Sequence, residues 1–183
     1  MQTVSFKLDG LHRLRKIVAS ADNRVAAAPL ERMFKKWTQI YSSFVRRRFK
    51  TNSRGGGDWP DLKAATVQRR RKGRRRKGGK FGGAGVRKTS IMYDTGTLYR
   101  ALVVGAPGNQ TQRVPHGVRY GFGSGARHPK GGTIAEIAVA HHTGAGHLPV
   151  RRILHVPDGQ TAAGMMRAAK QAVREIEGIV GHA

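Results

Sequence analysis

The chain has 183 residues, enough for one domain with a substantial core, and 35 Lys and Arg against 10 Asp and Glu, a formal net charge of +25. Such a charge opposes compaction and indicates an anionic partner, either a nucleic acid or an acidic protein surface. The absence of cysteine excludes disulfides and thiolate metal sites. No apolar stretch reaches the roughly 18–20 residues that span a bilayer, and residues 1–10 do not resemble a signal peptide. We therefore expect a soluble, cytosol-made protein without membrane contact.

The first quarter of the chain predicts one strand and two helices. Thr3–Leu8 alternates apolar and polar residues, as a half-buried strand does. Asp9 can cap a short helix over Leu11–Ser20, and Pro29 suits the first turn of a longer helix that runs to about Phe49. The longer helix is the best-determined element, because its apolar residues recur three and four positions apart for five turns. These residues are Leu30, Met33, Phe34, Trp37, Ile40, Tyr41, Phe44 and Val45.

The opposite side of this helix is predicted to be polar and cationic. Arg46, Arg47 and Arg48 complement the negative end of the helix dipole. We expect Arg46 and Arg47 to contact nucleic acid or a partner protein. The other polar positions on or near this side are Arg32, Lys35, Lys36, Gln39, Ser43 and Lys50.

Helical and strand periodicity both fail between residues 51 and 89. Trp59-Pro60-Asp61-Leu62 predicts a turn with two apolar anchors, and Leu62–Arg71 has the composition of a short helix that glycines end. The remainder is glycine-rich and basic. A structureless segment of this length is uncommon inside a domain unless it is functional or disordered.

The second half predicts short elements followed by one helix. Leu98–Val104 and Ile134–His142 each suit either a strand or a short helix, because periodicity cannot decide over so few residues. The other expected elements are a loop over Ala106–Gln112, a strand over Val114–Phe122, a loop over Ser124–Gly132, a short strand over Ile153–Val156, and a helix capped by Asp158 or Thr161 that runs to about Glu177 with Met165, Met166, Ala169, Val173 and Ile176 inward.

The sum of these elements predicts an α+β fold. A small, mostly antiparallel sheet is packed by the long helix of the N-terminal half and by the C-terminal helix. We expect a single domain over residues 1–183, with residues 51–89 as an extended, basic, glycine-rich internal loop.

The basic run within this loop is the strongest functional signal. Nine of the twelve residues from Arg69 to Lys80 are Lys or Arg, and no acidic residue occurs between Asp61 and Asp94. Such a run indicates nucleic-acid contact, and the near absence of aromatic residues favours backbone contact with duplex DNA or folded RNA over base stacking. The expected contact residues are Arg69, Arg70, Arg71, Lys72, Arg74, Arg75, Arg76, Lys77 and Lys80.

Metal binding and catalysis have weak support in the sequence. His141, His142 and His147, together with His128 and His155, could supply imidazole ligands, but no HExxH motif occurs and Glu136 stands at no recognised ligand spacing. The carboxylates are scattered, and the glycine-rich strings lack the order of a phosphate-binding loop. We expect no catalytic residue, no metal and no cofactor, and a protein that is not an enzyme.

Four separated segments stand in a recognisable order. They are Trp59-Pro60-Asp61-Leu62 with Thr66 behind it, Asp94-Thr95-Gly96-Thr97-Leu98, Ala140-His141-His142-Thr143-Gly144, and Leu148-Pro149-Val150-Arg151-Arg152-Ile153-Leu154. The series resembles the tail-completion, or virion morphogenesis, proteins of tailed bacteriophages. In that family a Trp-Pro-x-Leu turn precedes a long variable basic loop, and Thr-Gly-x-Leu, Ile-His-x-x-Gly and Pro-x-Arg-x-Phe-Leu elements follow before a C-terminal helix.

The resemblance covers about Leu30 to Glu177, and it departs from the family in two places. Ile153 stands where an aromatic residue is usual, and Ala140 where an aliphatic residue precedes the histidine, so that the family histidine is either His141 or His142. The structural residues that the resemblance implies are Trp59, Pro60, Leu62, Thr95, Gly96, Leu98, His142, Gly144, Pro149, Arg151 and Leu154.

The resemblance implies a subunit of a ring, commonly of six copies, in the neck or at the head-proximal end of a phage tail. Its partners would be portal, connector or stopper proteins on one side and tail tube or tail terminator proteins on the other, around a channel that DNA traverses. Such a protein is assembled in the host cytoplasm and resides in the virion. The alternatives are an RNA-binding protein of the ribosomal type and, third, a nuclease or other DNA-acting enzyme.

Overall fold

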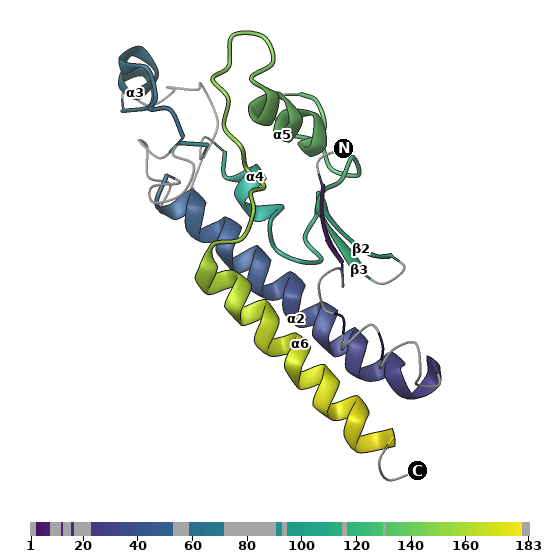
Figure 1. The fold of residues 1–183 in the computed structure, drawn as a ribbon. Helices are drawn as coiled ribbons and strands as arrows, with labels where there is room; N and C mark the ends of the chain where they lie inside the picture. The colour runs from purple at the N-terminus through teal and green to yellow at the C-terminus, as the bar shows by residue number, and fades with distance from the viewer. Residues whose placement is uncertain are drawn as a thin grey trace.

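The structure is a computed structural model, which describes residues 3–7, 12, 16, 23–52, 59–71, 91–92, 95–114, 117–129 and 131–180. Two long helices, α2 (Asn23–Lys50) and α6 (Gly159–Val180), lie side by side, and a small sheet packs against α2 (Figure 1). The shorter helices α3 (Ala64–Arg71), α4 (Thr97–Arg100) and α5 (Ile134–Thr143) lie toward the C-terminal end of α2. The fold is α+β, as predicted.

The sheet has three antiparallel strands in the order β1-β3-β2. They are β1 (Thr3–Lys7), β2 (Asn109–Val114) and β3 (Gly117–Phe122). The loop predicted over Ala106–Gln112 was wrong, because β2 begins at Asn109, whereas the strand predicted over Val114–Phe122 is confirmed from Gly117 to Phe122 as β3. As an edge strand, β2 exposes polar residues and lacks the apolar alternation that marks a strand in sequence. The central strand β3 buries Val118, Tyr120 and Phe122.

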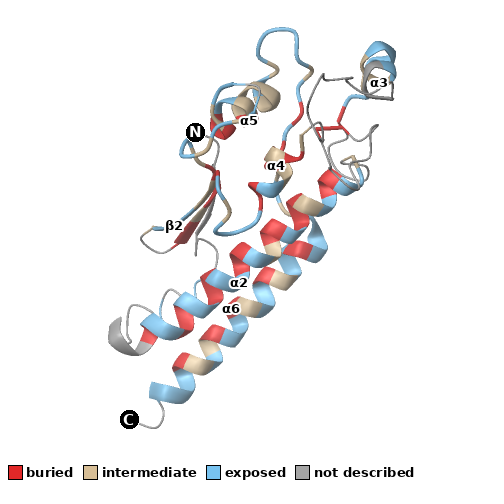
Figure 2. Ribbon diagram, turned by 180° about the vertical axis from the view of Figure 1, so that it is seen from behind, coloured by how far each residue is buried: buried red, intermediate tan, exposed pale blue. Residues whose placement is uncertain are grey.

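Helix α2 buries the apolar stripe that the sequence predicts (Figure 2). The Trp37 indole N–H donates to the Met165 carbonyl of α6 at 2.7 Å, and the Tyr41 ring meets the Tyr120 ring edge to face, with 5.5 Å between centroids. The predicted start at Pro29 was wrong by six residues. The helix begins at Asn23, because Ala26, Ala27 and Ala28 are strong helix formers and Ala26 is buried.

Helix α6 begins where the sequence predicts, because the Asp158 carboxylate accepts the Thr161 backbone N–H at 2.8 Å. Met165 and Ile176 lie in the core as expected. Met166 does not: it is 43% exposed, since one residue turns the helix by about 100° away from the buried face. Ala172 is buried in addition.

The two segments that suited either a strand or a short helix both contain helix and no strand. Leu98–Val104 begins with the single turn α4 and continues in turns, and Ile134–His142 lies within α5, which a Thr133–Glu136 capping box starts. The short helix expected within Leu62–Arg71 is confirmed as α3.

Two expectations remain for the rest of the chain. The strand predicted over Ile153–Val156 was wrong: the segment is irregular, because side chains of α2 bind its carbonyls, Arg48 at Ile153 and Tyr41 at His155. The helix predicted over Leu11–Ser20 lies, apart from residues 12 and 16, outside the described residues. Among the helices that the structure describes, none is long and apolar enough to cross a membrane.

Replacement of Trp37 by alanine should lower the free energy of unfolding by about 3–5 kcal/mol, because the indole is buried and a cavity would remain. Replacement by phenylalanine should cost clearly less, since it keeps an aromatic ring and loses chiefly the hydrogen bond to Met165. Urea denaturation of both variants measures the difference. Equal losses in the two variants would contradict this account of the α2–α6 contact.

Candidate functional site: the junction of four sequence segments

Four segments of the sequence, the last two of them only three residues apart, meet around one cavity of about 1000 Å³. We call this region the junction. Of the residues implied by the family resemblance, the cavity is lined by Pro60, Leu62, Thr95, Leu98, Pro149 and Arg151. The structure therefore brings members of the Trp-Pro, Thr-Gly and Pro-x-Arg segments together, and the histidine segment joins them through His141.

Trp59 attaches the junction to α2. Its indole is buried, donates to the Arg152 carbonyl at 3.1 Å and packs edge to face on Phe49, with centroids 5.1 Å apart. Arg48 of α2 is also buried, lies 5.7 Å from the Trp59 ring and donates to the Ile153 carbonyl at 3.3 Å. The cation and the ring therefore clamp the segment around residues 152–153 to the end of α2.

Arg151 joins the first segment to the fourth. Its guanidinium is buried and donates to the Pro60 carbonyl through Nη2 at 2.9 Å and Nε at 3.3 Å, and to the Asp61 carbonyl at 3.4 Å. Its backbone N–H donates to the His141 carbonyl at 2.7 Å. The rigid fork of arginine suits this two-point contact with backbone oxygen atoms, and lysine would lose it.

The Thr-Gly segment forms the start of α4. Gly96 is its N-cap with φ of 72°, a left-handed conformation that favours glycine. The Thr95 hydroxyl lies 2.8 Å from the Thr97 hydroxyl and 2.9 Å from Nε2 of His128. Burial lowers the pKa of His128. Leu98 is buried in the core, so this segment closes one wall of the cavity.

The two histidines of the third segment face different surroundings. His141 lines the cavity, whereas His142 lies in a separate hollow with Val150, Arg152 and Leu154. Burial and the adjacent Arg151 lower the pKa of His141 to about 4, and burial also lowers the pKa of His142. Within the described residues, Nδ1 of each ring is buried without a hydrogen-bond partner.

The structure gives intramolecular partners to the two α2 arginines expected to contact nucleic acid. Arg46 is half-buried, with its guanidinium carbon 5.2 Å from the Tyr99 ring centre, and Arg47 forms an ion pair with Asp158 at 2.8 Å. The backbone of Arg69, Arg70 and Arg71 forms the end of α3. The other predicted contact residues, Lys72, Arg74, Arg75, Arg76, Lys77 and Lys80, lie outside the described residues.

Sequence reasoning did not place Arg48, His128 or Ile137 in this region. Arg48 was read as part of a basic helix end, although it stands four positions after Phe44 and three after Val45 and so lies on the buried face of α2. His128 and Ile137 line the cavity from a glycine-rich loop and from α5, and no spacing in the sequence relates them to Trp59 or Arg151.

The chemistry of the junction is that of a scaffold and a binding surface. The Arg151 guanidinium is engaged with backbone carbonyls, and Asp61 is the one carboxylate among the described residues that line the cavity. In the part of the chain that the structure describes, no three His, Cys, Asp or Glu lie together as metal ligands would. No family model, no curated protein and no solved structure matches this chain.

The folded state should lose stability as the pH falls from about 6.5 toward 4. The pKa of His141 is about 4 in the fold and about 6.5 in an unfolded chain, so the unfolded state binds the proton in this window. We expect a loss on the order of 1–2 kcal/mol from this residue, since partial exposure of the ring to solvent weakens the effect.

The variant His141→Gln should lose part of this pH dependence in urea denaturation at pH 7 and pH 4.5. His128 and His142, whose pKa values are also lowered, retain the rest. The control is His147→Gln, since His147 is exposed. An unchanged slope in His141→Gln would show that His141 does not stay neutral in the fold.

The glycine of the third segment is required by geometry. Gly144 caps α5 with φ of 74°, and a Cβ there would lie 2.8 Å from Cγ2 of Val150 and 3.0 Å from the Leu148 carbonyl oxygen. Gly146 has φ of 68° but nothing within 4 Å. Gly146→Ala should therefore lower the free energy of unfolding by about 1–2 kcal/mol, because of its backbone conformation alone. Gly144→Ala should lower it clearly more, because the added Cβ also meets Val150 and Leu148. Thermal or urea unfolding of the two variants measures the difference. Equal losses of stability in the two variants would contradict this account of Gly144.

Proposed function

We propose that this chain is a structural virion protein of a tailed bacteriophage. In this proposal it forms a ring, commonly of six copies in such proteins, that closes the tail and joins it to the head connector around the DNA channel. Portal, connector or stopper proteins bind one face of the ring, and tail tube or tail terminator proteins bind the other. The ring is assembled in the host cytoplasm and resides in the neck of the virion.

The observation that carries the proposal is the convergence at the junction. Short motifs match by chance when each is taken alone. Here the residues that carry the resemblance also carry the contacts: Trp59 binds the Arg152 carbonyl, and Arg151 binds the Pro60 carbonyl. Gly96 and Gly144 both adopt left-handed conformations. The four segments thus behave as one structural unit, as a shared family architecture requires.

The placement of the basic run adds support. The segments that flank it are anchored, because Trp59 and Ile91 are buried and the Ile91 N–H donates to Oδ1 of Asn52 at 2.9 Å. Helix α3, where the run begins, lies at the same end of the molecule as the C-terminal end of α2 (Figure 1). A run held in this way delivers its charge to one place on an assembly. Phosphate contact carries no sequence information, which suits a conduit for DNA.

The purified protein should form a ring of several copies at moderate salt. Mass photometry and particle imaging measure the copy number and shape directly. A monomer that binds only structured RNA would instead support an RNA-binding protein of the ribosomal type, and metal-dependent DNA cleavage that survives stringent purification would support an enzyme. Either outcome would overturn the proposal.

DNA retention should depend on the basic run more than on net charge. Replacing Arg74, Arg75 and Arg76 by serine should reduce the slope of log affinity against log salt by about 2–3, since each phosphate contact contributes about 0.9. The control replaces Lys35, Lys170 and Arg174, which are exposed on α2 and α6, and removes the same charge. Equal effects of the two triple variants would show that only the overall charge matters.

A further inference from the structure

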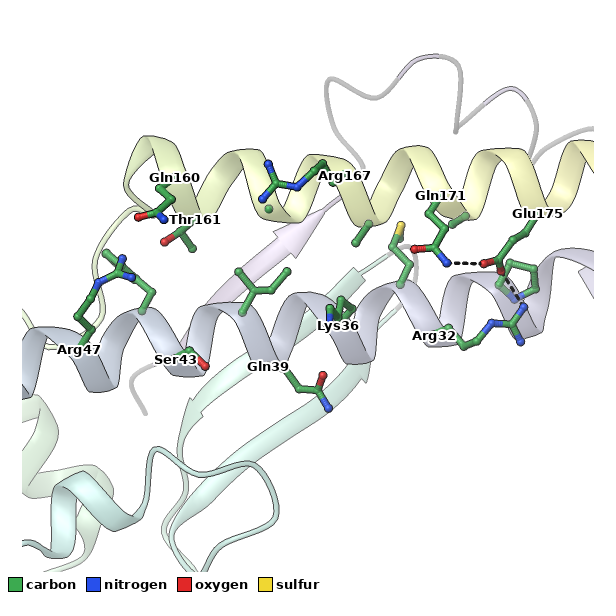
Figure 3. Close-up of a pocket in the computed structure, with 17 residues that line it drawn as sticks. Arg32, Lys36, Gln39, Ser43, Arg47, Gln160, Thr161, Arg167, Gln171 and Glu175 are labelled. Atoms are coloured by element: carbon green, nitrogen blue, oxygen red, sulfur yellow. Dashed lines mark hydrogen bonds and ion pairs between the residues drawn. The ribbon is translucent and has the colours of Figure 1, made fainter.

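An open groove runs between α2 and α6 on the side shown in Figure 3, with a volume of about 840 Å³. Arg32, Lys36 and Arg47 line it from α2, and Arg167 and Glu175 from α6. Arg32 and Arg47 are fifteen residues apart, which at 1.5 Å per residue makes the groove about 22 Å long.

The charges at the two ends of the groove are already paired. Arg32 binds Glu175 at 2.8 Å, and Arg47 binds Asp158 at 2.8 Å. At the centre, Lys36 and Arg167 line opposite helices, and neither forms an ion pair with a described residue. The groove therefore presents an unneutralised positive centre between two neutralised ends.

The floor at the centre is apolar and open. Ile40, Gly164 and Ala168 are half-buried there. Gly164 has no side chain, and a Cβ built on it would lie 3.7 Å from both Ile40 and Nη2 of Arg167. The guanidinium of Arg167 therefore lies close to the groove floor at Gly164. Neutral hydrogen-bonding side chains line the groove beside this floor, namely Gln39, Ser43 and Gln171.

We propose that this groove binds an amphipathic helix of a second protein, with one or two carboxylates at its middle and small apolar residues beside them. The carboxylates would pair with Lys36 and Arg167, and the apolar residues would cover Ile40 and Ala168. A groove between two packed helices accepts a third helix by ridge-into-groove packing, and about 15 residues of helix span its length. The site does not depend on ring formation or on DNA binding.

The charges distinguish this occupant from the other candidates. A nucleic-acid strand along 22 Å would bring phosphates to both ends of the groove, where Arg32 and Arg47 are already paired with Glu175 and Asp158 and would have to give up those partners. A second copy of this chain is poorly suited to supply the carboxylate, because its Asp158, Glu136 and Glu175 are already engaged within the chain. A partner helix with a central carboxylate would form ion pairs with Lys36 and Arg167 and would leave the ion pairs at the two ends of the groove intact.

A labelled helical peptide of about 18 residues serves as the probe, with alanine and leucine on one face and two glutamates four positions apart at its centre. Fluorescence anisotropy should show binding to the wild-type chain. The double variant Lys36→Glu, Arg167→Glu should weaken it at least about tenfold, because both cations become repulsive. The matched control is Lys35→Glu, Lys170→Glu, with the same charge change on the same helices outside the groove.

A second peptide, with lysine in place of both glutamates, should not bind. Circular dichroism of each variant establishes that the fold is retained, and mass photometry measures ring formation separately from peptide binding. The proposal would be overturned by absence of binding to the wild-type chain, or by equal weakening in the two double variants. It would also be overturned if a DNA duplex, and not the peptide, were the ligand that the groove variant loses.

Discussion

The described fold depends on one constraint: α2 has to be buried on several sides at once. Trp37 faces α6, Tyr41 meets the sheet, and Phe49 packs on Trp59 at the junction. Tyr41 also binds the irregular segment before α6, because its hydroxyl donates to the His155 carbonyl at 2.8 Å and accepts the His155 N–H at 3.2 Å. Burial raises the pKa of Tyr41, so the hydroxyl stays protonated at neutral pH and keeps both bonds. An irregular segment can therefore stand where a strand was expected, since α2 supplies its hydrogen bonds.

The elements that could be predicted from the sequence are those whose own pattern determines them. The long apolar stripe of α2 and the Asp158 cap of α6 are local signals, and both were recognised. The β2 strand was missed because its polar residues follow from its place at the sheet edge, which the local sequence does not encode. The junction was partly recognised through its four segments. The contact of Arg151 with Pro60 crosses 91 residues, and His128 enters from a glycine-rich loop, so no periodicity could relate them.

Three of the described carboxylates hold structural elements in place. Asp158 caps α6 and pairs with Arg47, Glu136 completes the capping box of α5, and Glu175 pairs with Arg32. These contacts lower the pKa of each carboxyl group. These three acidic residues therefore stay ionised and engaged over the neutral range, in a chain with 35 Lys and Arg against 10 Asp and Glu. The net positive charge of the surface therefore depends on the engagement of these carboxylates as well as on the basic run.

The edge strand β2 has a consequence for the behaviour of the protein at high concentration. A free strand edge is a template for backbone pairing between molecules, and such pairing is a common route to aggregation. Here the edge is short and reads Asn-Gln-Thr-Gln-Arg-Val, with Thr111, Gln112 and Arg113 exposed. It offers no run of apolar side chains that could interlock with a second sheet. The sheet can thus remain open at this edge without acting as a seed for fibre growth.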